Sequence, residues 1–197
     1  MRSKCGYSAR ADLRRIPKNS ARESSSRHSP SPFGGLSEND RPASVQKSAN
    51  SAAFIAAVMS ACQREKTDML MYYDARINSS MNGLFKQGTL DRLKGYYSVK
   101  AWGELLSLKN ECAVSCDVPD IYSAAAADGE TRMLLITYYT DAAAPLPRTF
   151  KVETGEDRLY TIYMLDEEHD MEPLETIASD NGEFTLTMRP NTVVVIK

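Results

Sequence analysis

The second half of the chain alternates short apolar stretches with turn signals, and this pattern limits the fold more than any other feature of the sequence. The Asp-Gly and Asn-Gly pairs at 128–129 and 181–182 are typical of tight hairpin turns. Strands are predicted at residues 121–127, 133–139, 145–147, 149–153, 159–165, 184–188 and 192–196. The regular spacing predicts an antiparallel β-sandwich over residues 110–197.

In the region from residue 35 to 109, the spacing of apolar residues differs from that of the second half. Apolar residues recur at helical spacing from about residue 40 to 64, and again over about 90–108. Between these helices, residues 69–73 (Met-Leu-Met-Tyr-Tyr) are continuously apolar, which is typical of a strand buried on both faces. The whole chain is therefore predicted to be α+β, with a helix–strand–helix unit before the sandwich.

Residues 1–34 are dominated by Ser, Arg and Pro, and this composition predicts a disordered leader. Residues 1–50 contain ten basic and four acidic side chains, a net charge of +6, whereas the rest carries −8. The leader is thus an RNA-binding or phosphorylated tail, a solvated basic tail, or sequence that is not under selection. For the acidic folded part we expect no nucleic-acid partner.

No secretory signal peptide is visible, and no apolar run approaches the ~18 residues needed to span a bilayer. We therefore expect no membrane partner, and a cytoplasmic location by default. We also expect neither a metal nor another cofactor. Neighbouring carboxylates along one turn cannot all converge on one ion with His169, so residues 166–170 are interpreted as an exposed acidic loop. Zinc-type spacing is absent from the four cysteines, Cys5, Cys62, Cys112 and Cys116.

A family resemblance emerges from the order of four segments, residues 51–58, 68–76, 82–85 and 93–97, followed by the predicted sandwich. This order resembles the end of the catalytic barrel in glycoside hydrolases similar to family 39. The resemblance implies that residues 35–109 are the last unit of a partial (β/α)8-barrel, with the eighth strand between two helices. It also implies that residues 110–197 form the all-β domain beside the barrel.

The resemblance implies a retaining mechanism for the whole enzyme, with an acid/base Glu after the fourth strand and a nucleophile Glu after the seventh. Both positions lie upstream of the matched region, so the chain is expected to lack them and to be inactive alone. Glu38 is the only carboxylate near the nucleophile position, but no apolar strand precedes it. Because the match begins abruptly near Gly35, we expect a truncated or mis-started reading frame.

What the resemblance leaves in this chain is the rim of the substrate cleft, at the carboxyl end of the eighth strand. By position, the substrate-binding residues would be Tyr73, Asp74, Arg76 and Asn82. An ion pair between Asp74 and Arg76 is an equally simple interpretation. Trp102, the single tryptophan, is expected to lie in the core rather than to stack on a sugar.

Two other functions stay open. One is a non-catalytic β-sandwich module that binds carbohydrate or a protein partner, and the other is a purely structural fragment. A cluster of exposed aromatic side chains would favour the module. The strand tyrosines that could form such a cluster are Tyr122, Tyr138, Tyr139, Tyr160 and Tyr163. A lone barrel strand needs neighbours on both edges, so we expect the helical region to self-associate or to dock on its own sandwich.

Overall fold

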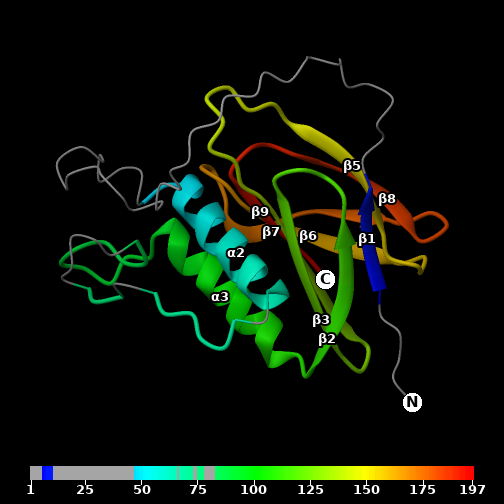
Figure 1. The fold of residues 1–197 in the computed structure, drawn as a ribbon, viewed down its shortest axis with the longest axis horizontal. Coiled ribbons are helices and arrows are strands. Elements are labelled where there is room, and N and C mark those ends of the chain that lie inside the picture. Colours follow the sequence, from blue (N-terminus) through cyan, green and yellow to red (C-terminus); the bar gives the residue numbers. More distant parts are fainter. Residues whose placement is uncertain (1–5, 11–46, 66, 73–74, 78–82) are drawn as a thin grey trace.

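The computed structural model describes residues 6–10, 47–65, 67–72, 75–77 and 83–197 (Figure 1). The chain is α+β, as the sequence predicted, with two helices and a mainly antiparallel β-sandwich. The helices are α2 (Ala49–Arg64) and α3 (Lys94–Ser107). The strands are β1 (Gly6–Arg10), β2 (Asn110–Cys116), β3 (Ile121–Asp128), β4 (Thr131–Tyr138), β5 (Arg148–Glu153), β6 (Leu159–Leu165), β7 (Asp170–Ala178), β8 (Glu183–Met188) and β9 (Thr192–Ile196).

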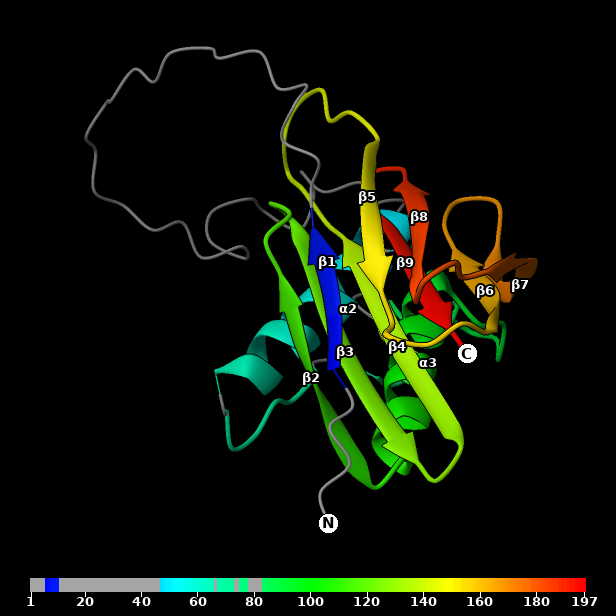
Figure 2. The same ribbon diagram turned by 90° about the vertical axis from the view of Figure 1, so that its right-hand side faces the viewer.

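The described strands follow the order β7-β6-β9-β4-β3-β2-β1-β5-β8. β2 is the corner of this arrangement, because its residues 110–112 pair with β3 and its residues 113–116 pair with β1. All the described pairings are antiparallel except that between β1 and β2. Strands β1, β5 and β8 form the second layer of the sandwich, in front of the longer sheet in Figure 2.

The sandwich core lies between these two layers. Alternate residues of β4 and β9, such as Leu134, Ile136 and Val194, point into it because successive side chains of a strand face opposite sides. From the second layer, Phe150 of β5 and Leu186 of β8 meet them. These buried side chains form the interior that the alternating sequence pattern predicted.

The other face of the longer sheet is covered by α2 and α3 (Figures 1 and 2). Leu135 of β4 and Val193 and Val195 of β9 belong to a second core with Trp102 and Leu105 of α3. β4 is therefore continuously apolar over residues 133–136 and β9 over residues 193–196, since both faces of these strands are buried. The helical region docks on the sandwich, which is one of the two outcomes that the sequence predicted for it.

Small residues allow this close packing. Ala52, Ala53 and Ala56 of α2 are fully buried, and the Ser98 hydroxyl of α3 donates to the Ala52 carbonyl at 2.8 Å. Gly95 permits the closest approach, since a Cβ there would lie 2.6 Å from the Gly83 carbonyl oxygen. The two helices thus form one unit against the sheet. Trp102, as predicted, is a core residue.

The predicted strand at residues 69–73 is wrong for the described part of it. Residues 69–72 adopt no strand, and Met69, Leu70 and Met71 are exposed. A strand satisfies its backbone hydrogen bonds through neighbouring strands, and none of the described strands pairs with this segment. The strand predicted at residues 145–147 is also absent, since Pro145 and Pro147 have no amide hydrogen to donate.

Three strands were not predicted. β2 has one fully buried residue, Cys112, and β7 is an almost fully exposed edge strand that contains Pro173. β1 lies within the leader that was expected to be disordered, yet it pairs with β2 and β5. These strands are specified by the open edges of their neighbours rather than by apolar patterning. The predicted start of the first helix near Asp40 lies outside the described residues.

Candidate functional site

The structure gives a position for one of the four predicted substrate-binding residues. Arg76 is described and is exposed. Tyr73, Asp74 and Asn82 lie outside the described residues, as does Glu38. The predicted carbohydrate-binding rim and the alternative Asp74–Arg76 ion pair therefore both stay predictions.

Tyr72, which precedes Tyr73 in the sequence, connects the exposed segment to the start of α3. Burial raises the pKa of the Tyr72 hydroxyl, while a hydrogen bond from the backbone of Gly83 works against that rise. Gly83 in turn lies against Gly95, in the first turn of α3. The segment that was predicted as a strand is thus attached to α3 near Tyr72.

An aromatic group at the start of α3 was not predicted as part of a site. The Tyr96 ring lies 5.5 Å from the rings of both Phe85 and Tyr97, and the Arg92 guanidinium lies 4.9 Å from the Tyr96 ring centre. All three rings are half-buried. The signal was present in the sequence as aromatic residues at both ends of a polar loop. Such ring faces suit the C–H faces of a sugar, although Arg92 already occupies one face of Tyr96.

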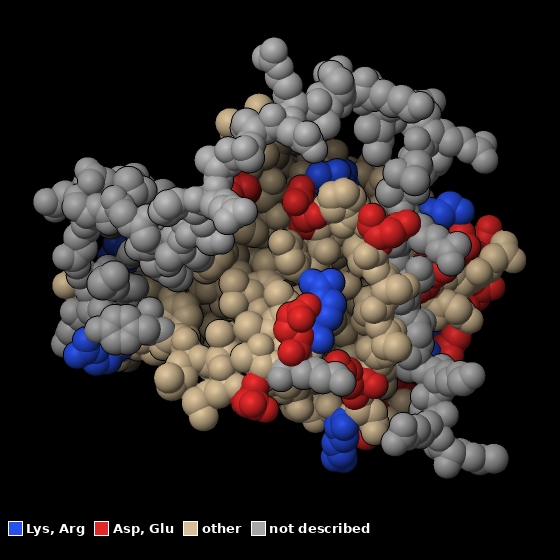
Figure 3. Space-filling model, in the orientation of Figure 1, with Lys and Arg blue, Asp and Glu red and all other residues tan. Residues whose placement is uncertain are grey.

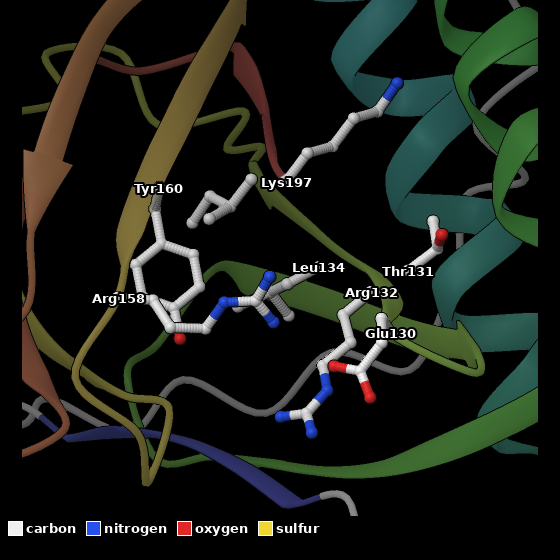
Figure 4. A pocket seen from close by; sticks show the side chains of 8 residues that line it. Glu130, Thr131, Arg132, Leu134, Arg158, Tyr160 and Lys197 are labelled. Carbon is white, nitrogen blue, oxygen red and sulfur yellow. The ribbon is translucent and has the colours of Figure 1, made fainter.

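A pocket of about 240 Å³ opens at one end of the sandwich (Figure 4). Leu134, Tyr160 and Ile196, all members of the sandwich core, contribute its apolar lining. Glu130 and Arg132, from the β3–β4 hairpin, and Arg158, just before β6, contribute its charged lining. Hydrogen-bond donors, an acceptor and an apolar surface thus meet in one place.

The charged side chains of the pocket differ in their partners. Arg132 forms an ion pair with Glu156 at 2.8 Å, whereas Arg158 has no ion-pair partner among the described residues. In Figure 4 the Arg158 side chain projects toward Leu134 and Arg132. Lys197 also lines the pocket, but its amino group points away and donates to Glu104 at 2.8 Å. Arg158 is therefore the cation of the pocket that is available to a ligand.

Hydrogen bonds hold the turn that carries Arg158. The Glu156 carbonyl accepts from the hydroxyls of Thr154 and Ser179 at 3.1 and 2.8 Å. The Ser179 hydroxyl also accepts from the Arg158 backbone amide at 2.8 Å, and the Asp157 carboxylate accepts from the Gly182 amide at 2.6 Å. The backbone position of Arg158 is thus fixed before any ligand arrives.

The pocket does not provide the pair of carboxyl groups that glycoside hydrolysis uses, commonly ~5–10 Å apart on either side of one bond. Glu130 is the single carboxylate among its lining residues. The described residues contain no group of three or more His, Cys, Asp or Glu side chains that could hold a metal ion.

The acidic turn around His169 has a structural role in the described part of the chain. The Asp166 carboxylate accepts from the Glu168 and His169 amides and contacts the His169 ring at 2.8 Å. Burial alone would raise the pKa of Asp166, but these hydrogen bonds hold it below its ordinary value. Glu167 accepts from the Ala49 amide at the start of α2, and Lys94 of α3 binds Asp170 at 2.8 Å. The turn therefore fastens both helices to the sheet.

The strand tyrosines do not form an exposed cluster. Tyr138 and Tyr160 are buried, while Tyr122, Tyr139 and Tyr163 are half-buried. On the face shown in Figure 3, lysines and arginines are scattered among acidic side chains and do not gather into a patch. None of the described helices is long and apolar enough to cross a membrane.

This chain is similar to known proteins in structure. No protein-family model matches the chain, and no curated protein is significantly similar to it in sequence. A GH30 endoxylanase from Clostridium papyrosolvens matches 76% of this chain with a TM-score of 0.60 and 12% identity. A family 30 subfamily 8 xylanase from Clostridium acetobutylicum matches 76% of this chain with a TM-score of 0.54 and 13% identity. A glucosidase from Croceicoccus marinus matches 75% of this chain with a TM-score of 0.58 and 14% identity.

These similarities establish the fold. The chain resembles glycoside hydrolases in fold, and the two Clostridium enzymes are of family 30, so the similarity does not point to the predicted family 39. The chain spans 38%, 39% and 42% of the lengths of these three proteins. It therefore corresponds in fold to a part of each of them.

Proposed function

We propose that this chain is the C-terminal portion of a retaining glycoside hydrolase and that it does not hydrolyse glycosidic bonds by itself. Its contribution is the sandwich, the two helices docked on it and part of the carbohydrate-binding rim, with Tyr73, Asp74, Arg76 and Asn82 as the binding residues. Of families 30 and 39, we propose family 30 for the whole enzyme, because the structural neighbours favour it.

One observation carries the proposal. About three quarters of the chain share a fold with three glycoside hydrolases, yet it spans only about two fifths of their lengths. In the barrel enzymes that this chain resembles, the acid/base and nucleophile carboxylates follow earlier strands of the barrel. A chain with the end of the barrel and the sandwich would thus lack the proton donor and the nucleophile together.

The test is hydrolysis of aryl β-xylosides, β-glucosides and α-arabinosides by the purified chain. We expect no release of the aryl alcohol above the rate without protein. Glu38→Gln serves as the comparison, because it removes the one carboxylate near the nucleophile position. Turnover in the wild-type chain that is abolished by Glu38→Gln would overturn the claim of inactivity and make Glu38 the leading nucleophile.

The second candidate is a non-catalytic module that binds carbohydrate. The pocket favours it, because Arg158, Glu130 and the apolar lining combine the chemistry that sugar hydroxyls and C–H groups require. Binding without turnover, measured by titration with soluble oligosaccharides, is the expected result. A chain that binds none of them would retain only the structural role.

A further inference from the structure

We propose that the pocket at the end of the sandwich binds one neutral pyranose ring, with Arg158 as the principal hydrogen-bond donor. This inference rests on the second proposed function, carbohydrate binding, and assigns it a place on the sandwich. Its lining includes none of the residues predicted for the rim and none of the aromatic group at the start of α3.

The size of the pocket limits the ligand. Ligand pockets for drug-sized molecules usually have volumes of roughly 300–1,000 Å³. A volume of about 240 Å³ is smaller, so the pocket suits a single sugar ring rather than an enclosed oligosaccharide. Further sugar units of a longer chain would extend into solvent.

The charges of the pocket favour a neutral ligand. Arg132 is neutralised by Glu156, the Lys197 amino group is turned away, and Glu130 lines the same pocket as Arg158. The net charge presented to a ligand is thus close to zero. An anion would gain one guanidinium but would also meet the Glu130 carboxylate, which repels it.

The chemistry of the lining matches a pyranose. Its hydroxyl groups both donate and accept, so they can accept from the Arg158 guanidinium and donate to the Glu130 carboxylate. Its C–H face is apolar and can contact the small apolar surface that the nearly buried Leu134 and Ile196, neighbours in the register of β4 and β9, leave at the pocket. A planar guanidinium can also reach two adjacent hydroxyls at once.

Preorganisation supports the assignment of Arg158. The hydrogen bonds of Thr154, Ser179 and Asp157 fix its turn, and Arg158 has no described ion pair that a ligand would have to displace. Binding therefore requires the ordering of one side chain rather than of a loop.

The experiment is an NMR titration of the full chain with methyl β-xyloside and methyl β-glucoside at millimolar concentrations. We expect saturable shifts of the backbone resonances of residues 130–134 and 158–160. Arg158→Ala should weaken binding about tenfold, as expected for the loss of hydrogen bonds from a charged group. The matched control is Arg189→Ala, which removes an exposed arginine that does not line the pocket and should leave the affinity unchanged.

Three outcomes would overturn the assignment. The first is saturable binding of acetate or glucuronate with none of the neutral sugars, which would make the pocket an anion site. The second is sugar-induced shifts near Phe85 and Tyr96 with none at the pocket, in which case carbohydrate binding survives and this location fails. The third is the absence of any saturable shift, which would remove the carbohydrate-binding function together with its site.

Discussion

The two helices and the segment between them differ in what surrounds their apolar side chains. α2 and α3 bury theirs against the longer sheet, and Leu135 of that sheet is 0% exposed beneath them. Residues 69–72 lie between the helices in sequence and are equally apolar, yet Met69 is 73% exposed and Met71 is 81% exposed. Apolar composition alone therefore did not decide burial.

The difference follows from backbone hydrogen bonding. A helix satisfies its amide and carbonyl groups internally, so it can dock on any apolar surface that fits its side chains. A strand must find a neighbour with an open edge before its side chains can be buried. In the structure the sheet offers the helices a face, and none of the described strands pairs with residues 69–72.

The largest expected effect is the difference between two leucine truncations, one in the sheet beneath the helices and one in the exposed segment. Leu135→Ala removes a fully buried side chain between the sheet and the helices and should lower the free energy of unfolding by about 2–5 kcal/mol. Leu70→Ala, in the exposed segment, should change it by less than about 0.5 kcal/mol. Urea unfolding of both variants measures the contrast, and equal losses would contradict it.

The glycines of α3 test the closeness of helix packing. Gly95→Ala places a methyl group 2.6 Å from the Gly83 carbonyl oxygen and should cost about 1–3 kcal/mol. Gly103→Ala, in the same helix, meets nothing within 4 Å and should stabilise the protein by up to about 1 kcal/mol through helix propensity. Thermal unfolding gives the sign of each change. A stabilising Gly95→Ala would show that the loop at Gly83 moves freely.

The ionic attachment of α3 is expected to have a smaller effect. Lys94 is 16% exposed, binds Asp170 at 2.8 Å and donates to the His169 carbonyl at 3.1 Å, so Lys94→Met should cost about 1–2 kcal/mol. Lys86→Met is the control, because the Lys86–Asp91 pair is exposed and 3.8 Å long. The control should unfold at nearly the wild-type urea concentration. A similar loss in both variants would argue against a special role for the Asp170 contact.

The smallest expected effect depends on pH. The lowered pKa of Asp166 means that its ionised form stabilises the folded state at neutral pH. This contribution is present above the unfolded-state pKa and is lost as pH falls below about 4 and through the folded-state pKa. Asp166→Asn should therefore be less stable than wild type at pH 7 and equal to it at strongly acidic pH. A constant difference across this range would exclude the carboxylate charge as the cause.

Much of the fold could be predicted because the apolar residues of the strands and helices follow regular periods. β3, β4, β6 and β9 were recognised from continuous or alternating apolar residues, and α2 and α3 from their stripes. β7 escaped prediction because it is an edge strand whose sequence is acidic and mostly exposed. β1 escaped because its place depends on the open edges of β2 and β5, which composition does not reveal.

The candidate sites were less predictable for a related reason. The pocket joins Glu130, Arg158 and Ile196, which come from three separate parts of the sequence. Arg158 has no local motif that distinguishes it from the other arginines. Its distinction is the hydrogen-bonded turn beneath it and the absence of an ion pair among the described residues, and both features exist only in the folded chain.

The position of β1 has a consequence for the order of folding. β1 is the strand through which the β5–β8 pair joins β2 and the rest of the sheet by backbone hydrogen bonds. It comes from the beginning of the chain, whereas its partners begin at Asn110 and Arg148. The β3–β4 hairpin closes over a two-residue turn and can form early, but pairing with β1 must close loops on the order of a hundred residues, at a greater entropic cost. The hydrogen bonds that link all nine strands are therefore completed late in folding. They form when β1, from the start of the chain, pairs with strands that belong to its second half.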